Sequence, residues 1–248
     1  PYFAVYSTFL QRAYDQIVHD VCLQNLPVCI LSDHVGLVGD DGKTHHGVLS
    51  VPMLMSIPNL TLLAPRDTRQ IRQAVRATLK LDGPCVVQYP KEGIEPYAQN
   101  VTGEPFAVGK WQTLIPGGQD AVILAYGRMT QNAIQASELL VQRGLSVGVI
   151  DCCSLKPLDM DCLRALFERK AKIVTIEEGE MIGGFGSEIA RVCVEENADA
   201  PVQIIGLENR FITHGSVPEL LRECGLMPEQ LADRIEEIAG DKESSHVG

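Results

Sequence analysis

The second half of the chain alternates short apolar runs with longer amphipathic segments, and this alternation restricts the fold more than any other feature. The apolar runs are residues 121–125, 146–151, 173–177 and 202–206, and the helical segments are 129–143, 159–170, 184–196, 217–223 and 228–239. Runs of this length are typical of buried strands, and the longer segments have helical spacing. Strands that alternate with helices of about 10–15 residues form βαβ units, so a doubly wound, mostly parallel sheet is predicted.

The first half predicts a second α/β unit with the same kind of sheet. Its expected strands are residues 1–6, 26–32, 60–64 and 85–89, and its expected helices are 7–23, 51–56 and 67–81. The pattern lapses between Lys91 and Gln119, where glycines and prolines accumulate, although residues 106–108 and 111–114 could add strands. We therefore predict an α/β protein with two domains. These are residues 1–92 and 120–240, with a linker at 93–119 and a flexible tail at 241–248.

Composition and charge exclude several classes of protein. The 248 residues are 45% hydrophobic and 21% charged, as in globular proteins, and no apolar run approaches the roughly 20 residues that span a bilayer. No signal peptide is visible, so we expect a cytoplasmic protein without a membrane partner. The net charge of −11 argues against nucleic acid as a partner. The eight cysteines include no Cys-x-x-Cys pair, so we expect reduced core residues and no metal site.

Residues 36–47 have the composition of a functional loop. Their sequence, Gly-Leu-Val-Gly-Asp-Asp-Gly-Lys-Thr-His-His-Gly, follows the apolar run at 26–31. Glycines let a backbone approach a ligand closely, and ligands of α/β sheets bind beyond the carboxyl ends of the strands. His45 and His46 could transfer protons there, because histidine can titrate near neutral pH. Considered alone, such a loop is more often a turn with solvated histidines.

Residues 6–16, Tyr-Ser-Thr-Phe-Leu-Gln-Arg-Ala-Tyr-Asp-Gln, form a second notable stretch at an expected strand-to-helix corner. An aromatic ring and a cation one helical turn apart could hold a flat heteroaromatic ring through stacking and a charge-assisted hydrogen bond. Phe9 and Arg12 have this spacing. Considered alone, they are more often a core aromatic residue and a surface arginine.

The two stretches together closely resemble the 1-deoxy-D-xylulose-5-phosphate synthases, a family of thiamine-diphosphate enzymes related to transketolase. Further matches are residues 57–60, 64–65, 83–84, 89–90, 156–159, 177–179, 183–187 and 210–215. The resemblance implies that the first domain is a pyrimidine-binding domain and the second a transketolase C-terminal domain. It also implies that the family's diphosphate-binding domain, with its Gly-Asp-Gly…Asn metal motif, and the cofactor-activating Glu are missing before Pro1.

The resemblance further implies an activity for the intact enzyme. That enzyme would condense pyruvate with glyceraldehyde 3-phosphate on thiamine diphosphate, with Mg²⁺ as a second cofactor and with loss of CO2. The diphosphate and Mg²⁺ site would lie outside this chain, so the chain alone is predicted to be inactive. Its expected partners are the two substrates and either a second copy of itself, in a homodimer, or the missing N-terminal domain.

The resemblance also assigns roles to individual residues. Tyr6, Phe9 and Arg12 would surround the aminopyrimidine ring of the cofactor, with Phe9 stacked on it. Asp41 and His45 would face the substrate as catalytic residues, and His45 could form a hydrogen bond or transfer a proton.

The likeness is weaker where the family binds the acceptor phosphate. The family's Asp-Arg-Ala-Gly is Asp-His-Val-Gly at residues 33–36, and its Arg-Tyr-Pro-Arg-Gly is Gln-Tyr-Pro-Lys-Glu at 88–92. His34 and Lys91 therefore occupy the predicted substrate-binding positions, but neither offers the two-pronged hydrogen bond of arginine. The chain could then act on a less anionic aldehyde as a split transketolase-type subunit. Alternatively, it could be a degenerate, non-catalytic paralogue that dimerises or regulates a partner.

Two further features leave alternatives open. Glu177 and Glu178 could suggest acid–base chemistry, but a strand-end pair at a domain interface is the expected role. The helix that begins after residues 183–187 could bind an anion at its N-terminus, or these residues could form a tight turn for packing.

Overall fold

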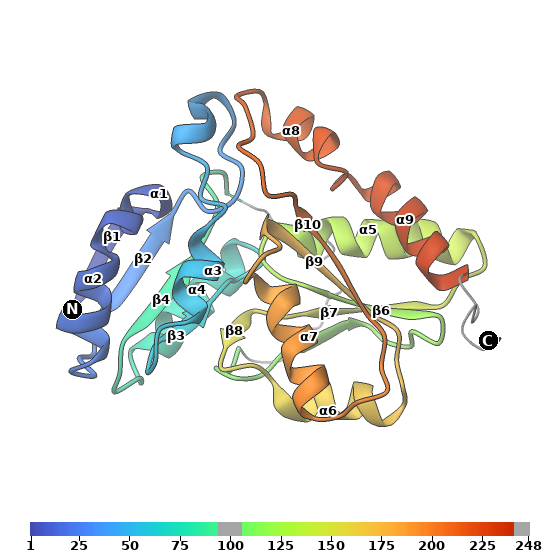
Figure 1. The fold of residues 1–248 in the computed structure, drawn as a ribbon, viewed down its shortest axis with the longest axis horizontal. Coiled ribbons are helices and arrows are strands. Elements are labelled where there is room, and N and C mark those ends of the chain that lie inside the picture. Colours follow the sequence, from blue (N-terminus) through green and yellow to red (C-terminus); the bar gives the residue numbers. More distant parts are fainter. Residues whose placement is uncertain (94–105, 241–248) are drawn as a thin grey trace.

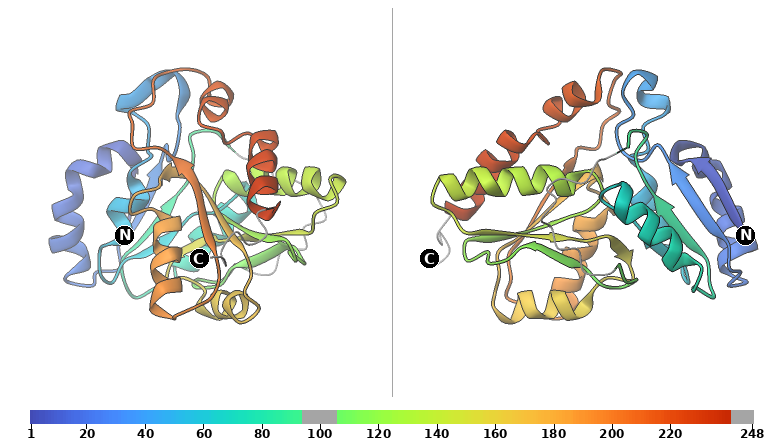
Figure 2. Two further views of the ribbon diagram at one scale, coloured as in Figure 1. Left: turned by 45° about the vertical axis from the view of Figure 1, so that its right-hand side comes forward. Right: turned by 180° about the vertical axis from the view of Figure 1, so that it is seen from behind.

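The computed structural model describes residues 1–93 and 106–240, which contain two five-stranded sheets with helices around them (Figure 1). The predicted tail at 241–248 and part of the predicted linker, residues 94–105, lie outside the described residues. The right-hand view of Figure 2 shows β1 at one end of the molecule and α9 at the other.

The first sheet has the strand order β1-β2-β4-β3-β8. Its first four strands, all parallel, are β1 (Tyr2–Tyr6), β2 (Cys29–Asp33), β4 (Cys85–Gln88) and β3 (Thr61–Leu63). The fifth strand, β8 (Ser154–Lys156), comes from the second half of the chain and pairs antiparallel with β3. The sequence did not predict β8, because a three-residue strand is too short for a pattern that separates it from a loop.

The second sheet has the strand order β10-β9-β6-β7-β5. Its parallel strands are β10 (Val202–Leu207), β9 (Ile173–Glu180), β6 (Ala121–Ala125) and β7 (Val147–Asp151). The strand β5 (Gln112–Ile115) pairs antiparallel with β7, so the possible strand at 111–114 is confirmed to within one residue. Both sheets are mostly parallel and are flanked by helices, which confirms the predicted fold class.

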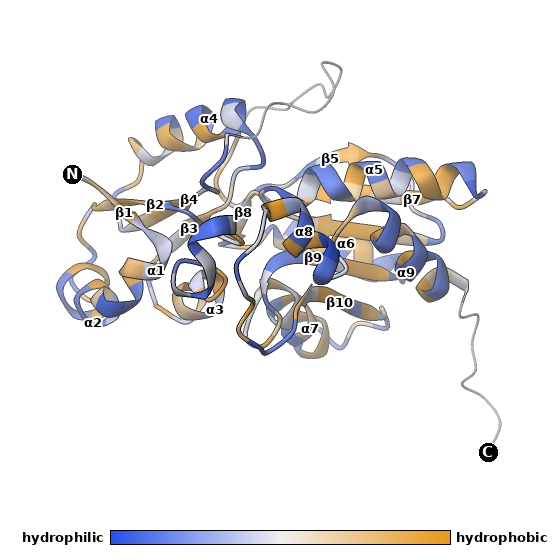
Figure 3. Cartoon of the chain, turned by 90° about the horizontal axis from the view of Figure 1, so that it is seen from above, coloured by the Kyte–Doolittle hydropathy of each residue, from blue (hydrophilic) through white to orange (hydrophobic). Residues whose placement is uncertain are grey.

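The helices that cover the sheets begin and end close to the predicted positions. They are α3 (Ser50–Met55), α4 (Thr68–Thr78), α5 (Met129–Gln142), α6 (Met160–Glu168), α7 (Phe185–Glu195), α8 (Val217–Glu223) and α9 (Pro228–Gly240). Asp67 and Asp159 cap α4 and α6, since their carboxylates accept the backbone N–H groups of Gln70 at 2.7 Å and Cys162 at 3.2 Å. Figure 3 shows helices with a hydrophilic and a hydrophobic side around mostly hydrophobic strands, as a layered α/β core requires.

The predicted helix at residues 7–23 is wrong as one continuous element. The structure divides it into α1 (Ser7–Leu10), a 3-10 turn (Gln11–Ala13), α2 (Tyr14–Gln16) and a π-helix (Ile17–Cys22). Leu10, Ile17 and Cys22 are all buried in the core. Ile17 and Cys22 are five residues apart, the spacing of the i→i+5 hydrogen bond of a π-helix, so the widened turn brings both side chains toward the core.

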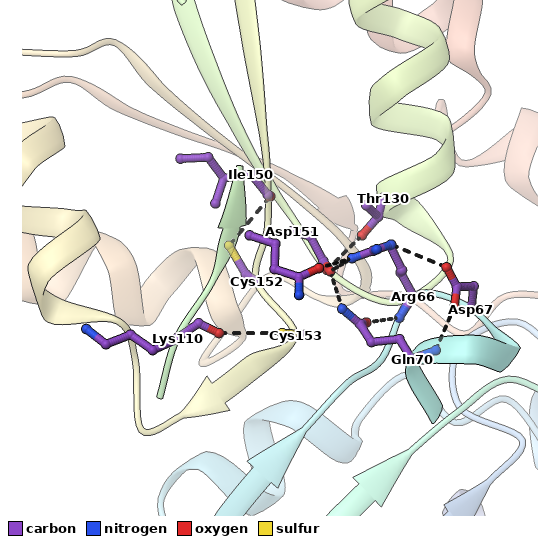
Figure 4. A network of polar contacts seen from close by, with 10 residues as sticks. Arg66, Asp67, Gln70, Lys110, Thr130, Ile150, Asp151, Cys152 and Cys153 are labelled. Atoms are coloured by element: carbon purple, nitrogen blue, oxygen red, sulfur yellow. Dashed lines mark hydrogen bonds and ion pairs between the residues drawn. The ribbon is translucent and has the colours of Figure 1, made fainter. Parts of the chain in front are cut away.

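A buried polar network joins the two halves of the chain (Figure 4). Arg66, which follows β3, forms an ion pair with Asp151 at the end of β7 and donates to Gln112 at 2.7 Å. Gln70 of α4 donates to the same Asp151 carboxylate at 2.6 Å. Burial raises the pKa of Asp151, while the neighbouring Arg66 guanidinium acts in the opposite direction. Together with β8, this network packs the two halves into one unit.

The cysteines behave as the sequence predicted. All eight are free thiols, and six of them are buried: Cys22, Cys29, Cys85, Cys152, Cys153 and Cys193. Within the described part of the chain, no helix combines the length and the apolar character that would let it cross a membrane.

Candidate active site

Residues 36–47 form a closed loop between β2 and α3. The Gly36 N–H donates to the Gly47 carbonyl at 3.2 Å, and the Gly47 N–H donates to the Gly36 carbonyl at 2.8 Å, so the two ends of the loop are bridged. Between them, Gly39–Thr44 wind into 3-10 turns, where Gly42 has a φ of 70° that favours glycine. Figure 1 shows this loop beside the segment that leads into α8.

Four aromatic side chains form a continuous row from the end of β1 to this loop. The Tyr6 ring stacks on His34, with centroids 3.8 Å apart, and on Phe9, with centroids 5.5 Å apart. The Phe9 ring meets the His45 ring edge-on, with centroids 5.5 Å apart and an interplanar angle of 70°. The structure therefore brings together four of the predicted site residues, which come from β1, α1, the residue after β2 and the loop of residues 36–47.

One side of this row is open to solvent. Phe9 and Tyr6 are 42% and 39% exposed, although aromatic rings are largely buried in most proteins. Arg12 lies in the 3-10 turn three residues after Phe9 and is exposed as well. Residues three apart lie near the same side of a helical segment, as the predicted pairing of Phe9 and Arg12 requires. This surface can receive a flat heteroaromatic group.

Asp41 and Lys91, which the sequence placed in different roles, form an ion pair. The Lys91 Nζ lies 2.8 Å from the Asp41 Oδ2, and both side chains are about 40% exposed. The hydrogen bond from Lys91 lowers the pKa of Asp41, and the bond to Asp41 raises the pKa of Lys91. The charge of Lys91 is thus offset within the chain before any ligand binds.

His34 is packed against its neighbours. Its backbone has a φ of 59°, an uncommon value for a residue other than glycine. The backbone N–H donates to the Asp33 Oδ1 at 2.7 Å, and the ring Nδ1 lies 3.0 Å from the same oxygen. The residue is 8% exposed, and Tyr6 stacks on its ring. His34 therefore offers a ligand little surface in this arrangement.

The two adjacent histidines differ in a way that the sequence could not reveal. The His46 Nδ1 accepts the Val38 N–H at 3.1 Å, so its Nε2 carries the proton and donates to the Thr213 carbonyl at 3.0 Å. His46 is therefore a buried, neutral residue that ties the loop to the second domain. The ring of His45 contacts Phe9, and its Nδ1 lies 3.0 Å from the Thr44 hydroxyl. No sequence pattern predicts this contact between Thr44 and His45.

The carboxylates near the end of β9 make internal contacts. Glu177 accepts the backbone N–H groups of Phe185 and Gly186, each at 2.9 Å, so the N-terminus of α7 does hold an anion, which is the chain's own. Burial raises the pKa of Glu177 to about 7. Glu178 accepts the Leu37 N–H of the loop at 2.8 Å. Of the expected interface pair, Glu178 contacts the first domain, whereas the contacts of Glu177 with Phe185, Gly186 and Tyr126 lie within the second domain. Both residues lie inside β9, which continues to Glu180.

A pocket of about 260 Å³ opens beside the loop. Its lining includes Thr8, Gln11, Lys43, Thr44, Arg210 and Phe211. Thr8 and Thr44 precede Phe9 and His45 in the sequence, and the Thr8 hydroxyl donates to the Thr44 carbonyl at 3.0 Å. In residues 1–93 and 106–240, no three His, Cys, Asp or Glu side chains are grouped so that they could hold a metal ion.

Two family models match the chain. The model described as transketolase, pyrimidine binding domain, matches residues 1–95, and the model described as transketolase, C-terminal domain, matches residues 109–231. The 1-deoxy-D-xylulose-5-phosphate synthase of Geobacillus thermodenitrificans is 42% identical over 98% of this chain and 39% of its own length. The enzyme of the same name from Thermus thermophilus is 41% identical over 92% of this chain and 36% of its own length. The chain thus spans little more than a third of these curated relatives.

Solved structures give the same result for the fold. A split-gene transketolase, in the form of an inactive beta4 tetramer, superposes with a TM-score of 0.87 at 28% identity, over 98% of this chain and 77% of that chain. The transketolase of Campylobacter jejuni superposes with a TM-score of 0.78 at 17% identity, over 96% of this chain and 35% of its own, which supports the fold alone. The chain therefore belongs to the transketolase family, of which it carries the pyrimidine-binding and C-terminal domains.

Proposed function

We propose that this chain is part of an enzyme of the 1-deoxy-D-xylulose-5-phosphate synthase type. That enzyme condenses pyruvate with glyceraldehyde 3-phosphate, releases CO2 and uses thiamine diphosphate and Mg²⁺. The observation that supports this most directly is the row of rings that ends at His45 on a transketolase fold. Curated relatives with that name, at 40–42% identity, support the type of reaction.

The exposed face of Phe9 fits the aminopyrimidine ring of thiamine diphosphate in size and chemistry. When bound, this cofactor supplies a carbon nucleophile and an electron sink for the decarboxylation of a 2-oxo acid. Phe9 would stack on the ring, and Tyr6, which lies parallel to Phe9 within 12°, would hold Phe9 in place. Arg12 would border the ring as a cation. The diphosphate and Mg²⁺ would be held by residues outside this chain.

His45 is the acid–base residue of this proposal. Because its Nδ1 faces the Thr44 hydroxyl, its Nε2 is the nitrogen that would donate a proton to a substrate oxygen or accept one from it. Asp41 remains ionised beside Lys91 and would accept hydrogen bonds from substrate hydroxyl groups. In the assembled enzyme, His45→Gln should lower kcat by about 10²–10⁴-fold with little change in cofactor affinity. Unchanged turnover in this variant would remove His45 from the mechanism.

The activity should depend on a second chain or domain. This chain spans 36–39% of the length of its curated relatives, and the similar split-gene transketolase was solved as an inactive beta4 tetramer. In a carboligation assay with pyruvate and glyceraldehyde 3-phosphate, the chain alone should give no product. Addition of a chain that carries a diphosphate-binding domain should restore product formation. Product from the chain alone would contradict this dependence, and no product with any such partner would favour the non-catalytic alternative.

We further propose that the enzyme is cytoplasmic and that it forms a dimer. The strand β1 lies at the outer edge of the first sheet, where Tyr2 and Phe3 are 45% and 53% exposed. Exposed aromatic residues on an edge strand suit an interface with another chain. Either a second copy or the diphosphate-binding part could cover them.

A second candidate function differs only in the acceptor. The Lys91 ammonium is engaged by Asp41, and His34 is packed under Tyr6, so neither presents a free cation to a phosphate group. We propose on this basis that a less anionic aldehyde could replace glyceraldehyde 3-phosphate. The ratio of kcat/KM for glyceraldehyde 3-phosphate to that for glyceraldehyde separates the two candidates. A ratio near or below one supports the second candidate, and a ratio of about 100 or more supports the first, since a charge-assisted bond contributes roughly 1.5–3 kcal/mol.

A further inference from the structure

We propose that Glu178, a residue of the second domain, is the positioning residue that holds the loop of residues 36–47 in its working shape. This inference deepens the proposed function, because the loop carries Asp41 and His45. The catalytic role of the loop rests on the proposed function. The anchoring of the loop by Glu178 does not, because it can be measured without any turnover.

The contact between Glu178 and the loop is direct and tightly fitted. The Glu178 Oε1 accepts the Leu37 N–H at 2.8 Å. A Cβ atom on Gly36 would lie 2.6 Å from the Glu178 Cδ and 2.8 Å from both of its carboxylate oxygens. Gly36 also has a φ of 78°, so glycine is needed there both for the backbone and for the carboxylate. The first two residues of the loop are therefore shaped around this side chain.

The negative charge of Glu178 is paired with a cationic residue of its own domain. The Glu178 side chain is 8% exposed, and the Arg128 Nη1 lies 3.5 Å from its Oε1. Arg128 comes from the turn between β6 and α5, and its side chain is 10% exposed. Burial of a carboxylate is costly unless it is paired and hydrogen-bonded. Here the carboxylate of the buried pair accepts a backbone N–H of the other domain. This arrangement suits a role of Glu178 in positioning that backbone.

The other contacts on this side of the loop are packing of the buried Leu37 side chain into the hydrophobic core of the second domain, backbone hydrogen bonds and a hydrogen bond from the loop's own His46. The Glu180 N–H donates to the Val48 carbonyl at 3.0 Å, and the His46 ring donates to the Thr213 carbonyl at 3.0 Å. The bridge between Gly36 and Gly47 closes the loop but leaves its position relative to β9 open. The Glu178 carboxylate is thus the polar anchor at the start of the loop, beside the packing of Leu37, while the contact of His46 anchors its end.

The position of the loop start matters for the chemistry on its other side. There, the ring centroids of His45 and Phe9 lie 5.5 Å apart, and the Lys91 Nζ lies 2.8 Å from the Asp41 Oδ2. A glycine-rich loop has more conformational freedom to lose than other loops, so it needs anchors to keep one shape. If the start is released from Glu178, the loop should sample other shapes, and the contact between His45 and Phe9 should weaken.

Amide hydrogen exchange of the full chain tests the anchor. Glu178→Ala and Gly36→Ala should speed exchange at residues 37–47 by about tenfold, because each breaks the fit between the loop and the carboxylate. Glu178→Gln should have a smaller effect, since its amide oxygen can still accept the Leu37 N–H but no longer balances Arg128. Glu180→Gln is the matched control: it changes a buried carboxylate on the same strand whose Oε1 accepts the Ile182 N–H at 3.2 Å and not the loop.

Exchange at residues 121–125, in the centre of the second sheet, separates release of the loop from general unfolding, and it should stay unchanged in every variant that folds. If Glu178→Ala does not fold, Glu178→Gln and Gly36→Ala decide the question. Exchange at residues 37–47 within twofold of the wild type in both of these variants would overturn the proposal. If exchange rises as expected but the assembled wild-type enzyme shows no carboligation, the proposed function fails while the positioning role stands.

Discussion

At the scale of single residues, Phe9 is an aromatic side chain of the candidate site that stays partly exposed. Phe9→Ala should weaken thiamine diphosphate binding to the assembled enzyme by about 1–3 kcal/mol, the scale of a lost aromatic contact. The free energy of unfolding should change little, because the ring is already 42% exposed. Cofactor titration by calorimetry measures the affinity, with Phe3→Ala as a control for an exposed ring on β1. Equal affinities of wild type and Phe9→Ala would assign the ring a purely structural role.

A second prediction at this scale concerns residues 34 and 91, the positions that we propose as contacts of the acceptor phosphate. Arginine at both positions should restore two-pronged phosphate contacts, so His34→Arg with Lys91→Arg should raise the preference for glyceraldehyde 3-phosphate over glyceraldehyde by at least about tenfold. Steady-state kinetics with both aldehydes measures this ratio. Lys43→Arg, a change of the same kind on the loop, should leave the ratio unaltered. A constant ratio in the double variant would mean that these positions do not contact the acceptor phosphate.

At the scale of elements, Glu177 links the end of β9 to the start of α7. Burial raises the pKa of Glu177 to about 7 in the folded state, above the 4.5 of an ordinary glutamate. The folded state therefore binds more protons between these values, so the stabilisation is complete below pH 4.5 and is lost as the pH rises through 7. Glu177→Gln cannot titrate. The free energies of unfolding of both proteins can be measured with urea at several pH values. On acidification, the wild type should gain about 3 kcal/mol of stability relative to Glu177→Gln.

A constant stability difference between the wild type and Glu177→Gln across this range would show that folding does not raise the pKa of Glu177. Glu195→Gln on the exposed side of α7 is a suitable control, because that carboxylate forms a surface pair with Arg191 and is 60% exposed. Its removal should change stability by less than about 1 kcal/mol.

The elements also show what sequence could and could not predict. The helix α5 and the strand β6 were predicted within a residue or two. The 14 residues of α5 carry many positions of the helical period, and the 5 residues of β6 form an uninterrupted apolar run. The helix at 7–23 failed because a π turn has another period, and β8 failed because it is too short. In the site, motif resemblance indicated Phe9 and His45, while the distinct partners of His45 and His46 depend on contacts with residues far along the chain.

At the scale of the whole molecule, the pair of Arg66 and Asp151 holds the two halves together. Arg66→Met should destabilise the protein by about 3–5 kcal/mol, because it leaves the fully buried Asp151 carboxylate without a compensating charge. Calorimetric unfolding measures the loss. Arg72→Met, on the exposed side of α4, is the matched control and should have little effect.

Adding Asp151→Asn to Arg66→Met should recover part of the lost stability, since no unpaired charge then remains buried. If Arg66→Met costs no more than the Arg72→Met control, the network does not stabilise the junction, and β8 alone would have to connect the halves.

The crossing of β8 into the first sheet has a consequence for modularity. Three residues of the second half, Ser154–Lys156, cover the edge of β3, so the sequence boundary between the two family domains is not a boundary of the structure. A gene fragment that encodes the first family domain alone would leave that edge unpaired and open to aggregation. The unit that evolution or an engineer can move between genes intact is the pair of domains. A chimera that exchanges only the first domain must retain a second domain that supplies a matching strand.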